Sequence, residues 1–245
     1  MHQPIELPAA DSIVVLTGAG ISVESGLPSF RGADGLWEGW RLEEVATPEA
    51  FARQPATVQR FYDQRRRQLL GADVHPNPAH TALARLEARW PGEVLVVTQN
   101  IDDLHERAGT RNLVHMHGEL LRARCTACAA LHVCRHDLEP EHRCRGCGRP
   151  NVLRPHVVWF GEMPLALDAI YAALSRCDLF LAIGTSGQVY PAAGFVEQIR
   201  RHGRAHTIEL NLEPSAVGSL FAEHRPGPAG ETVPRLVGEI LGTPD

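Results

Sequence analysis

Short apolar runs rich in β-branched residues recur along the chain, and stretches with helical periodicity separate them. The first run, residues 11–17, ends at the turn Gly18-Ala19-Gly20. Further apolar runs predict strands over residues 94–98, 113–116, 179–183 and 207–210. Amphipathic stretches predict helices over residues 78–89, 165–175, 191–201 and 233–241. Strands that alternate with helices are typical of an α/β, doubly wound parallel sheet with helices on both faces. We therefore expect a Rossmann-like fold.

Two segments interrupt this alternation. Residues 43–70 have a helical pattern, and Thr47-Pro48-Glu49 supplies a cap and a proline in the first turn. Residues 125–147 are polar and rich in cysteine. We expect the Rossmann-like domain to comprise residues 1–30, 76–118 and 156–245. A helical insertion, 31–75, and a cysteine-rich insertion, 119–155, are expected to form a smaller domain together.

The cysteines of the second insertion form two pairs. Cys125 and Cys128 are separated by two residues, as are Cys144 and Cys147, and fifteen residues lie between the pairs. Two such pairs predict a zinc ribbon with four thiolate ligands, and a closed four-thiolate site indicates a structural role. Two disulfides are the alternative, which a cytoplasmic location disfavours. His132 and Cys134 lie between the pairs and remain alternative ligands.

Charge and composition exclude some classes of protein. The 245 residues carry a net charge of −5, with 22% charged and 44% hydrophobic residues, which argues against disorder and against a globally basic nucleic-acid binder. All 24 basic residues are arginines, so the chain has no lysine side chain that can be acylated. No apolar run approaches the roughly 20 residues that span a bilayer, and residues 1–10 lack a signal-peptide pattern. We expect a cytoplasmic protein without membrane contact.

The glycine turn after the first predicted strand suits a dinucleotide, because Gly18 and Gly20 let the backbone approach a pyrophosphate. The third glycine of the usual fingerprint is absent. No acidic residue follows about 20 positions later at the end of a second strand, as an NAD-dependent dehydrogenase requires. The turn therefore predicts nucleotide binding, and an oxidoreductase is the weaker alternative.

Six motifs follow one another along the chain. The first is Gly18-Ala19-Gly20-Ile21-Ser22-Val23-Glu24-Ser25-Gly26-Leu27-Pro28-Ser29-Phe30-Arg31. The others are Thr98-Gln99-Asn100-Ile101-Asp102, His115-Met116-His117-Gly118-Glu119, the two cysteine pairs, Gly184-Thr185-Ser186 and Asn211-Leu212-Glu213. In this order they resemble the signature motifs of the sirtuin family. The resemblance implies an enzyme that consumes NAD to remove acyl groups from protein lysines, giving nicotinamide and O-acyl-ADP-ribose.

The resemblance also implies roles for individual residues. His117 corresponds to the general base that activates a ribose hydroxyl, a task that suits a neutral imidazole. Asn100 and Asp102 correspond to the pair that orders the ribose and the nicotinamide. His115 would share a strand face with His117, so strand alternation does not choose between the two histidines. The residues implied to contact NAD are Gly18, Ala19, Gly20, Ile21, Phe30, Arg31, Gln99, Asn100, Ile101, Asp102, Gly184, Thr185, Ser186, Asn211 and Glu213.

Two further segments are implied to contact the acylated lysine. The segment 155–162 resembles the edge that pairs with the substrate peptide as an added strand, with Val158, Phe160 and Gly161 as contacts. Tyr62 and Arg65, three residues apart, resemble the acyl-pocket pair of class III sirtuins, and Ala46 matches the small residue that widens that pocket. Since an arginine fork binds a carboxylate, the resemblance implies a preference for succinyl and malonyl groups over acetyl. Arg66 and Arg67 are interpreted as a solvated surface run.

Two alternative functions stay open at this point. A protein mono-ADP-ribosyltransferase would use the same NAD site. A zinc-ribbon nucleic-acid module is less favoured, because the arginines around the cysteines are not interleaved with an aromatic platform. No specific nucleic acid is therefore expected as a partner.

Overall fold

The computed structural model describes residues 12–29, 37, 39–139, 141–203 and 205–243. Its main sheet has six parallel strands in the order β3-β2-β1-β7-β8-β9. The central strands β1, β2 and β7 are fully buried, which explains their continuous apolar sequences. The strands are β1 (Ile13–Thr17), β2 (Val94–Thr98), β3 (Leu113–His115), β7 (Leu179–Ile183), β8 (His206–Asn211) and β9 (Glu223–Pro226).

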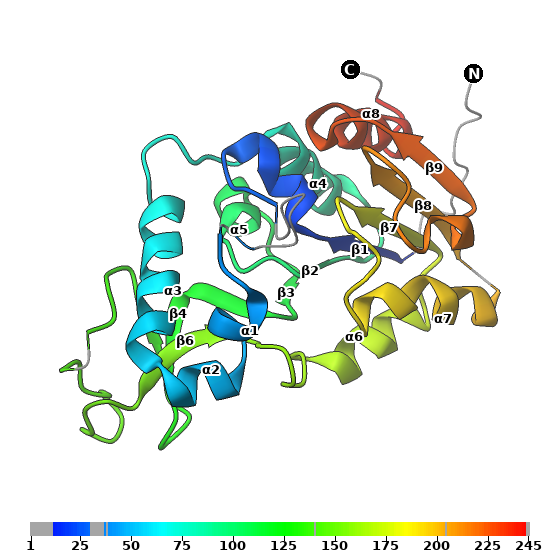
Figure 1. The fold of residues 1–245 in the computed structure, drawn as a ribbon. Helices are drawn as coiled ribbons and strands as arrows, with labels where there is room; N and C mark the ends of the chain where they lie inside the picture. The colour runs from blue at the N-terminus through cyan, green and yellow to red at the C-terminus, as the bar shows by residue number, and fades with distance from the viewer. Residues whose placement is uncertain (1–11, 30–36, 38, 140, 204, 244–245) are drawn as a thin grey trace.

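Helices cover both faces of this sheet (Figure 1). On one face α4 (Pro78–Arg89) and α8 (Ala229–Ile240) share an apolar core with the sheet, and on the other face α6 (Leu167–Leu174) and α7 (Phe195–His202) do the same. The connections between these elements also contain short helical segments. They are α5 (Leu104–Ala108) and the 3₁₀ turns η1 (Ala19–Ser25), η2 (Ala192–Gly194) and η3 (Gly218–Leu220). The predicted doubly wound α/β fold is confirmed.

The strand order reverses between β1 and β7. From β1 the chain adds β2 and then β3 on one side, whereas β7, β8 and β9 extend the sheet on the other side. In open parallel sheets, ligands bind at the carboxyl ends of the strands at such a reversal. The turn after β1 and the loop after β7 therefore mark the place where a nucleotide site is expected.

A smaller module lies beside the sheet (Figure 1). Its antiparallel sheet places β4 (Gly118–Cys125) between β5 (Leu131–Val133) and β6 (Leu153–Val157). The helices α1 (Leu42–Val45), α2 (Pro48–Arg53) and α3 (Pro55–Leu69) pack on β4 and β6 through one shared apolar core. The helices of the first insertion thus share one apolar core with two strands of the antiparallel sheet.

Arg66 corrects one sequence-based interpretation. Its side chain is 1% exposed and therefore does not belong to a solvated run. The guanidinium donates to the Leu120 and His136 carbonyls and pairs with Asp63, whose carboxylate also accepts from the Leu138 amide. Arg66 thus joins α3 to β4 and to the segment after β5, while its neighbour Arg67 is 60% exposed and pairs with Asp137. The pattern did not separate the two because α3 is buried on more than one face.

No helix in the described part of the chain is both long and apolar enough to cross a membrane.

Candidate active site

Gly18, Gly20 and Gly184 bring the turn after β1 against the loop after β7. A Cβ on Gly20 would lie 2.6 Å from the Gly184 Cα, and one on Gly184 would lie 2.5 Å from the Ile21 nitrogen. The Gly20 amide donates to the Gly184 carbonyl at 2.9 Å, and Gly184 adopts a φ of +62°, which favours glycine. Backbone therefore packs directly on backbone at the sheet reversal. This contact positions η1, which carries the predicted NAD contacts Ala19 and Ile21.

A buried hydrogen-bonded chain connects η1 to the loop after β2. The Asn100 side-chain amide donates to the Ser22 hydroxyl at 3.1 Å, and that hydroxyl donates to the Asp102 carboxylate at 3.0 Å. The second Asp102 oxygen accepts from the Leu104 amide. Asn100 and Asp102 are each 8% exposed. The two predicted positioning residues are thus joined through Ser22, a residue to which sequence analysis assigned no separate role.

Burial raises the pKa of the Asp102 carboxyl to about 6, against an ordinary value of 3.8. The hydrogen bonds from Leu104 and Ser22 and the nearby charge of His115 lower this pKa but do not outweigh burial. Asp102 therefore ionises close to neutral pH. A pKa displaced in this direction by burial is typical of functional carboxyl groups.

His117 lies in the turn between β3 and β4. Because β3 ends at His115, the two histidines do not share a strand face, contrary to the sequence-based expectation. The His117 Nδ1 lies 3.0 Å from the Gln99 carbonyl, which fixes Nδ1 as the protonated nitrogen and leaves the lone pair on Nε2. Burial lowers the pKa of His117, and the Gln99 carbonyl offsets only part of that effect. His117 is therefore neutral near pH 7, with a basic nitrogen available.

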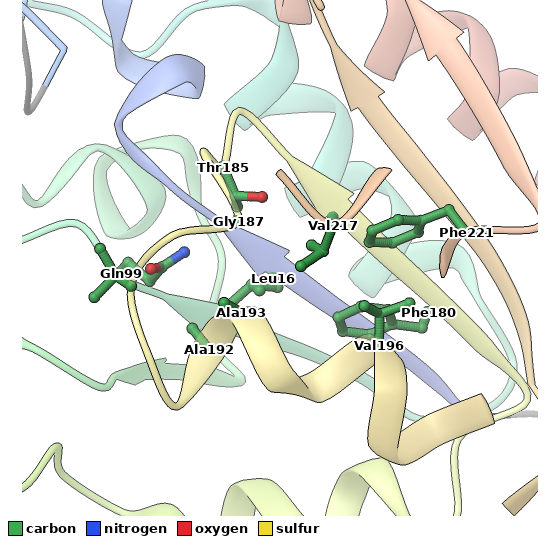
Figure 2. A pocket seen from close by; sticks show the side chains of 12 residues that line it. Leu16, Gln99, Phe180, Thr185, Gly187, Ala192, Ala193, Val196, Val217 and Phe221 are labelled. Atoms are coloured by element: carbon green, nitrogen blue, oxygen red, sulfur yellow. The ribbon is translucent and has the colours of Figure 1, made fainter. Parts of the chain in front are cut away.

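Several of the predicted NAD contacts gather around the loop after β7. Asn211, at the end of β8, donates to the Thr185 carbonyl at 2.8 Å, while Ser186 and Glu213 are exposed. Gln99 and Thr185 also line a mainly apolar pocket beneath this loop, in which Gln99 lies opposite Phe180 and Phe221 (Figure 2). The predicted contacts from β1, β2, β7 and β8 thus meet at one edge of the sheet. The predicted contacts Phe30 and Arg31 lie outside the described residues.

Backbone hydrogen bonds attach the predicted peptide-binding segment to the turn that carries His117 and to the residue after α1. The Val158 amide donates to the His117 carbonyl at 2.9 Å, and the Phe160 amide donates to the Ala46 carbonyl at 3.0 Å. Phe160 is 39% exposed, and Gly161 follows it with a φ of +88°. The structure therefore joins Val158 to His117 and Phe160 to Ala46, so one short segment contacts both the proposed base and the residue after α1.

Tyr62 and Arg65 lie buried on α3 in the core of the small module. The Tyr62 hydroxyl accepts from the Trp159 indole at 2.9 Å, which leaves its own proton for donation to another group. Burial is the largest influence on the Tyr62 pKa and raises it, so the phenol stays protonated. The Arg65 guanidinium stacks 3.9 Å from the centre of the Phe61 ring. Sequence analysis missed Trp159, although it falls inside the predicted peptide-binding segment.

The four paired cysteines converge at the end of the small module. Cys125 and Cys147 have their sulfurs 3.7 Å apart, and Cys128 and Cys144 have theirs 3.6 Å apart. Tetrahedral zinc with bonds of about 2.3 Å to sulfur requires sulfur separations of about 3.8 Å. The donor set and its spacing fit zinc.

His132 and Cys134, the alternative ligands, are placed differently. His132 Nε2 lies 3.2 Å from the Cys144 sulfur, at hydrogen-bonding distance. The Cys134 thiol donates to the His136 carbonyl and packs in a separate small core. Among the described residues, the sulfur cluster therefore contains the four paired cysteines, with His132 beside it.

Comparisons with known proteins agree with this geometry. The model of the Sir2 family matches residues 18–191. An NAD-dependent protein deacylase of Salmonella typhimurium is 59% identical over 94% of this chain and 84% of its own length. Its counterpart in Vibrio cholerae is 59% identical over 94% of this chain and 93% of its own. A crystal structure of a Sir2 homologue with NAD superimposes with a TM-score of 0.86 and 40% identity, covering 96% of this chain and 91% of the other.

The doubly wound sheet, the glycine contact at its reversal and the four-sulfur cluster define a nucleotide-binding protein with a structural metal module. The chain belongs to the Sir2 family, the sirtuins.

Proposed function

We propose that this protein is an NAD-dependent protein-lysine deacylase that favours succinyl and malonyl groups and also removes acetyl groups. The relatives at 58–59% identity, named NAD-dependent protein deacylases, support the reaction class. The buried Tyr62–Arg65 pair supports the acyl preference. We also propose that acylated protein lysines are its substrates and that it works in the cytoplasm, a reducing compartment that keeps thiols free for zinc.

The NAD side of the proposed site is built from η1, the loop after β2 and the loops after β7 and β8. Bound NAD supplies the ribose carbon that accepts the acyl oxygen when nicotinamide leaves. Ser22 holds Asn100 and Asp102 in one hydrogen-bonded chain, so the polar groups proposed to order the ribose and nicotinamide are already aligned. Preorganisation of this kind spares the enzyme a reordering step during the reaction.

His117 is proposed as the general base. Its Nδ1 is engaged by the Gln99 carbonyl, so its Nε2 can take a proton from a ribose hydroxyl. The lowered pKa keeps the imidazole neutral and ready to accept that proton. Since the His117 carbonyl also accepts from the Val158 amide, the base is tied to the segment proposed to bind the peptide.

The charge of the acyl pocket carries the proposed preference. Arg65 is 6% exposed and Tyr62 is fully buried, so both donors lie away from bulk water. A carboxylate at the end of a succinyl group can accept from the guanidinium and from the phenol together. A hydrogen bond to a charged group contributes roughly 1.5–3 kcal/mol, which corresponds to about a ten- to hundredfold preference. An acetyl group makes no such contact.

Substituting Arg65→Met tests the preference. We expect kcat/KM for a succinyl-lysine peptide to fall about ten- to hundredfold, while kcat/KM for the acetyl-lysine form changes by less than about threefold. Peptide and NAD are titrated separately, so that a loss of acyl binding is distinguished from a loss of NAD binding.

Arg67→Met is the matched control. Arg67 lies on the same helix but is 60% exposed, so its removal should leave both activities unchanged. Equal losses of both activities in Arg65→Met would show that Arg65 supports the fold instead. ADP-ribosylated protein without deacylated peptide would contradict the deacylase proposal itself.

A further inference from the structure

Three side chains meet beside the proposed catalytic loop and take no part in the function described above. Glu106 on α5, His115 at the end of β3 and Glu119 on β4 each place one polar atom within 4.8 Å of the others. The His115 side chain is 10% exposed, and the Glu106 side chain is 41% exposed. His115 is therefore largely buried, while its partner Glu106 is exposed to solvent.

Both ring nitrogens of His115 face hydrogen-bond acceptors. Nδ1 lies 3.2 Å from the Asn100 carbonyl, and Nε2 lies 2.8 Å from the Glu106 carboxylate. Neither acceptor can donate when the carboxylate is ionised, so both contacts are hydrogen bonds only if both nitrogens carry protons. The geometry thus selects the imidazolium form. His117 differs in this respect, because its hydrogen bond with the Gln99 carbonyl engages Nδ1 alone.

We propose that His115 is a positioning residue, held as an imidazolium by Glu106, that fixes the Asn100 carbonyl and thereby the loop carrying Asn100 and Asp102. The peptide group after Asn100 leads through Ile101 directly to Asp102, so a shift of this carbonyl displaces both polar side chains. Two histidines separated by Met116 then have opposite tasks: a cationic His115 orders the NAD-binding loop, and a neutral His117 accepts the proton.

The charged groups around His115 favour this assignment. Burial lowers its pKa, but the hydrogen bond and charge of Glu106, the Asn100 carbonyl and the charge of Glu119 outweigh burial, and the net pKa is raised. The pKa of Glu106 is lowered in turn, since its contacts with His115 outweigh burial. On the buried side, the His115 charge lowers the pKa values of Asp102 and His105. Arg122 pairs with Glu119 at 2.8 Å and also lowers the pKa of Glu106.

The proposal predicts a specific pH dependence. Because the pKa of His115 is raised by its partner, the imidazolium is present below that pKa and is lost as pH rises through it. NAD-dependent activity should therefore decline on the alkaline side, because the neutral imidazole keeps one N–H for two acceptors and no longer holds the Asn100 carbonyl and the Glu106 carboxylate together. Removing the Glu106 charge should move this decline toward lower pH.

Glu106→Gln changes the charge with little change of shape, and it is the first variant to measure. We expect KM for NAD at pH 8 to rise roughly tenfold, the factor that one charge-assisted hydrogen bond contributes, with the melting temperature unchanged. The alkaline limb of kcat/KM should lie at lower pH than in the wild type. A profile that superimposes on the wild-type profile overturns the proposal.

Further variants distinguish hydrogen bonding by the His115 side chain from its simple bulk, and from metal binding by the cluster. His115→Asn places an amide near the position of Nδ1 and should recover part of the activity lost in His115→Ala; equal loss in both overturns the proposal. Glu119→Gln is the matched control and should move the alkaline limb less than Glu106→Gln. A divalent cation bound by the cluster would use Glu119 as well, so equal effects of the two glutamines also overturn the proposal.

This inference rests on the proposed function, and the wild-type enzyme separates the two. Absence of NAD-dependent turnover by the wild type contradicts the proposed function. Normal wild-type turnover with unaltered variants contradicts the role of His115 alone.

Discussion

The carboxyl group of Asp102 is held inside the protein by two donors, the Ser22 hydroxyl and the Leu104 amide. Despite these contacts, burial raises its pKa to about 6. The folded state therefore binds the Asp102 proton more tightly than the unfolded state does, where the ordinary value is 3.8. The resulting stabilisation is complete below pH 3.8 and is lost as pH rises through about 6. At neutral pH the ionised carboxylate destabilises the fold.

Asp102→Asn should therefore stabilise the protein while impairing catalysis. We expect the free energy of unfolding at pH 8 to rise by about 1–3 kcal/mol, because the desolvated charge is removed and the Ser22 hydroxyl can accept from the new amide. The gain should shrink as pH falls below about 6. Denaturant titrations of both proteins at pH 8 and pH 4 measure this, and a variant less stable than the wild type at pH 8 would contradict it.

Functional residues could be predicted from the sequence where they belong to a local motif. Contacts that depend on the three-dimensional fold could not. Asn100 and Asp102 were proposed together from a local motif, but their link through Ser22 spans about 80 residues of chain and depends on how η1 docks. The distinction between His115 and His117 likewise required the end of β3, since strand alternation alone places both on one face. The hydrogen bond from Trp159 to Tyr62 joins the segment after β6 to helix α3. These segments lie far apart in the sequence, so no periodic pattern predicts the contact.

At the scale of elements, apolar periodicity predicted the main sheet closely. The strands over 94–98 and 179–183 and the helix over 78–89 match β2, β7 and α4 at both ends. Their boundaries were predictable because local chemistry sets them: Asn77 caps α4, accepting from the Ala79 and His80 amides, and Pro78 occupies its first position. Helix α3 was harder, because its charged residues face different environments.

Arg66 and Arg67 provide a test of that difference. Arg66→Met should lower the free energy of unfolding by about 3 kcal/mol, because it leaves the buried Asp63 carboxylate without its cation. Arg67→Met should change it by less than about 0.5 kcal/mol, since its pair with Asp137 is exposed. Denaturant unfolding of the two variants gives the comparison. Similar losses in both would show that Arg66 does not join α3 to the strands.

At the scale of the whole molecule, the metal cluster and the proposed base occupy the two ends of one strand. β4 ends at Cys125 and begins at Gly118, directly after His117, and β6 pairs along it from Leu153 to Val157. The paired strands β4 and β6 therefore connect the cysteines to the turn that carries His117, and we expect a loss of order at the cysteines to reach that turn. The sequence indicated both sites but not this connection, which depends on the register of β4 with β6.

Cys144→Ser should accordingly abolish activity from a distance. We expect the variant to lose its zinc, to lose order in the small module and to show no deacylation, while the main sheet stays folded. Metal analysis, near-UV circular dichroism and turnover are measured on the same samples. A metal-free variant with normal turnover would refute the coupling.

The hydrogen bond from the Trp159 indole to the Tyr62 hydroxyl has a consequence for protein engineering. The residues proposed to select the acyl group all come from one insertion. Transplanting the segment from α1 to α3 into another family member is therefore the obvious way to transfer acyl selectivity. However, Trp159, which orients Tyr62, lies outside that segment. Phe160, whose amide donates to the Ala46 carbonyl, also lies outside it. A graft between family members should therefore carry residues 159–160 with the helices, and its success or failure is decided at that junction.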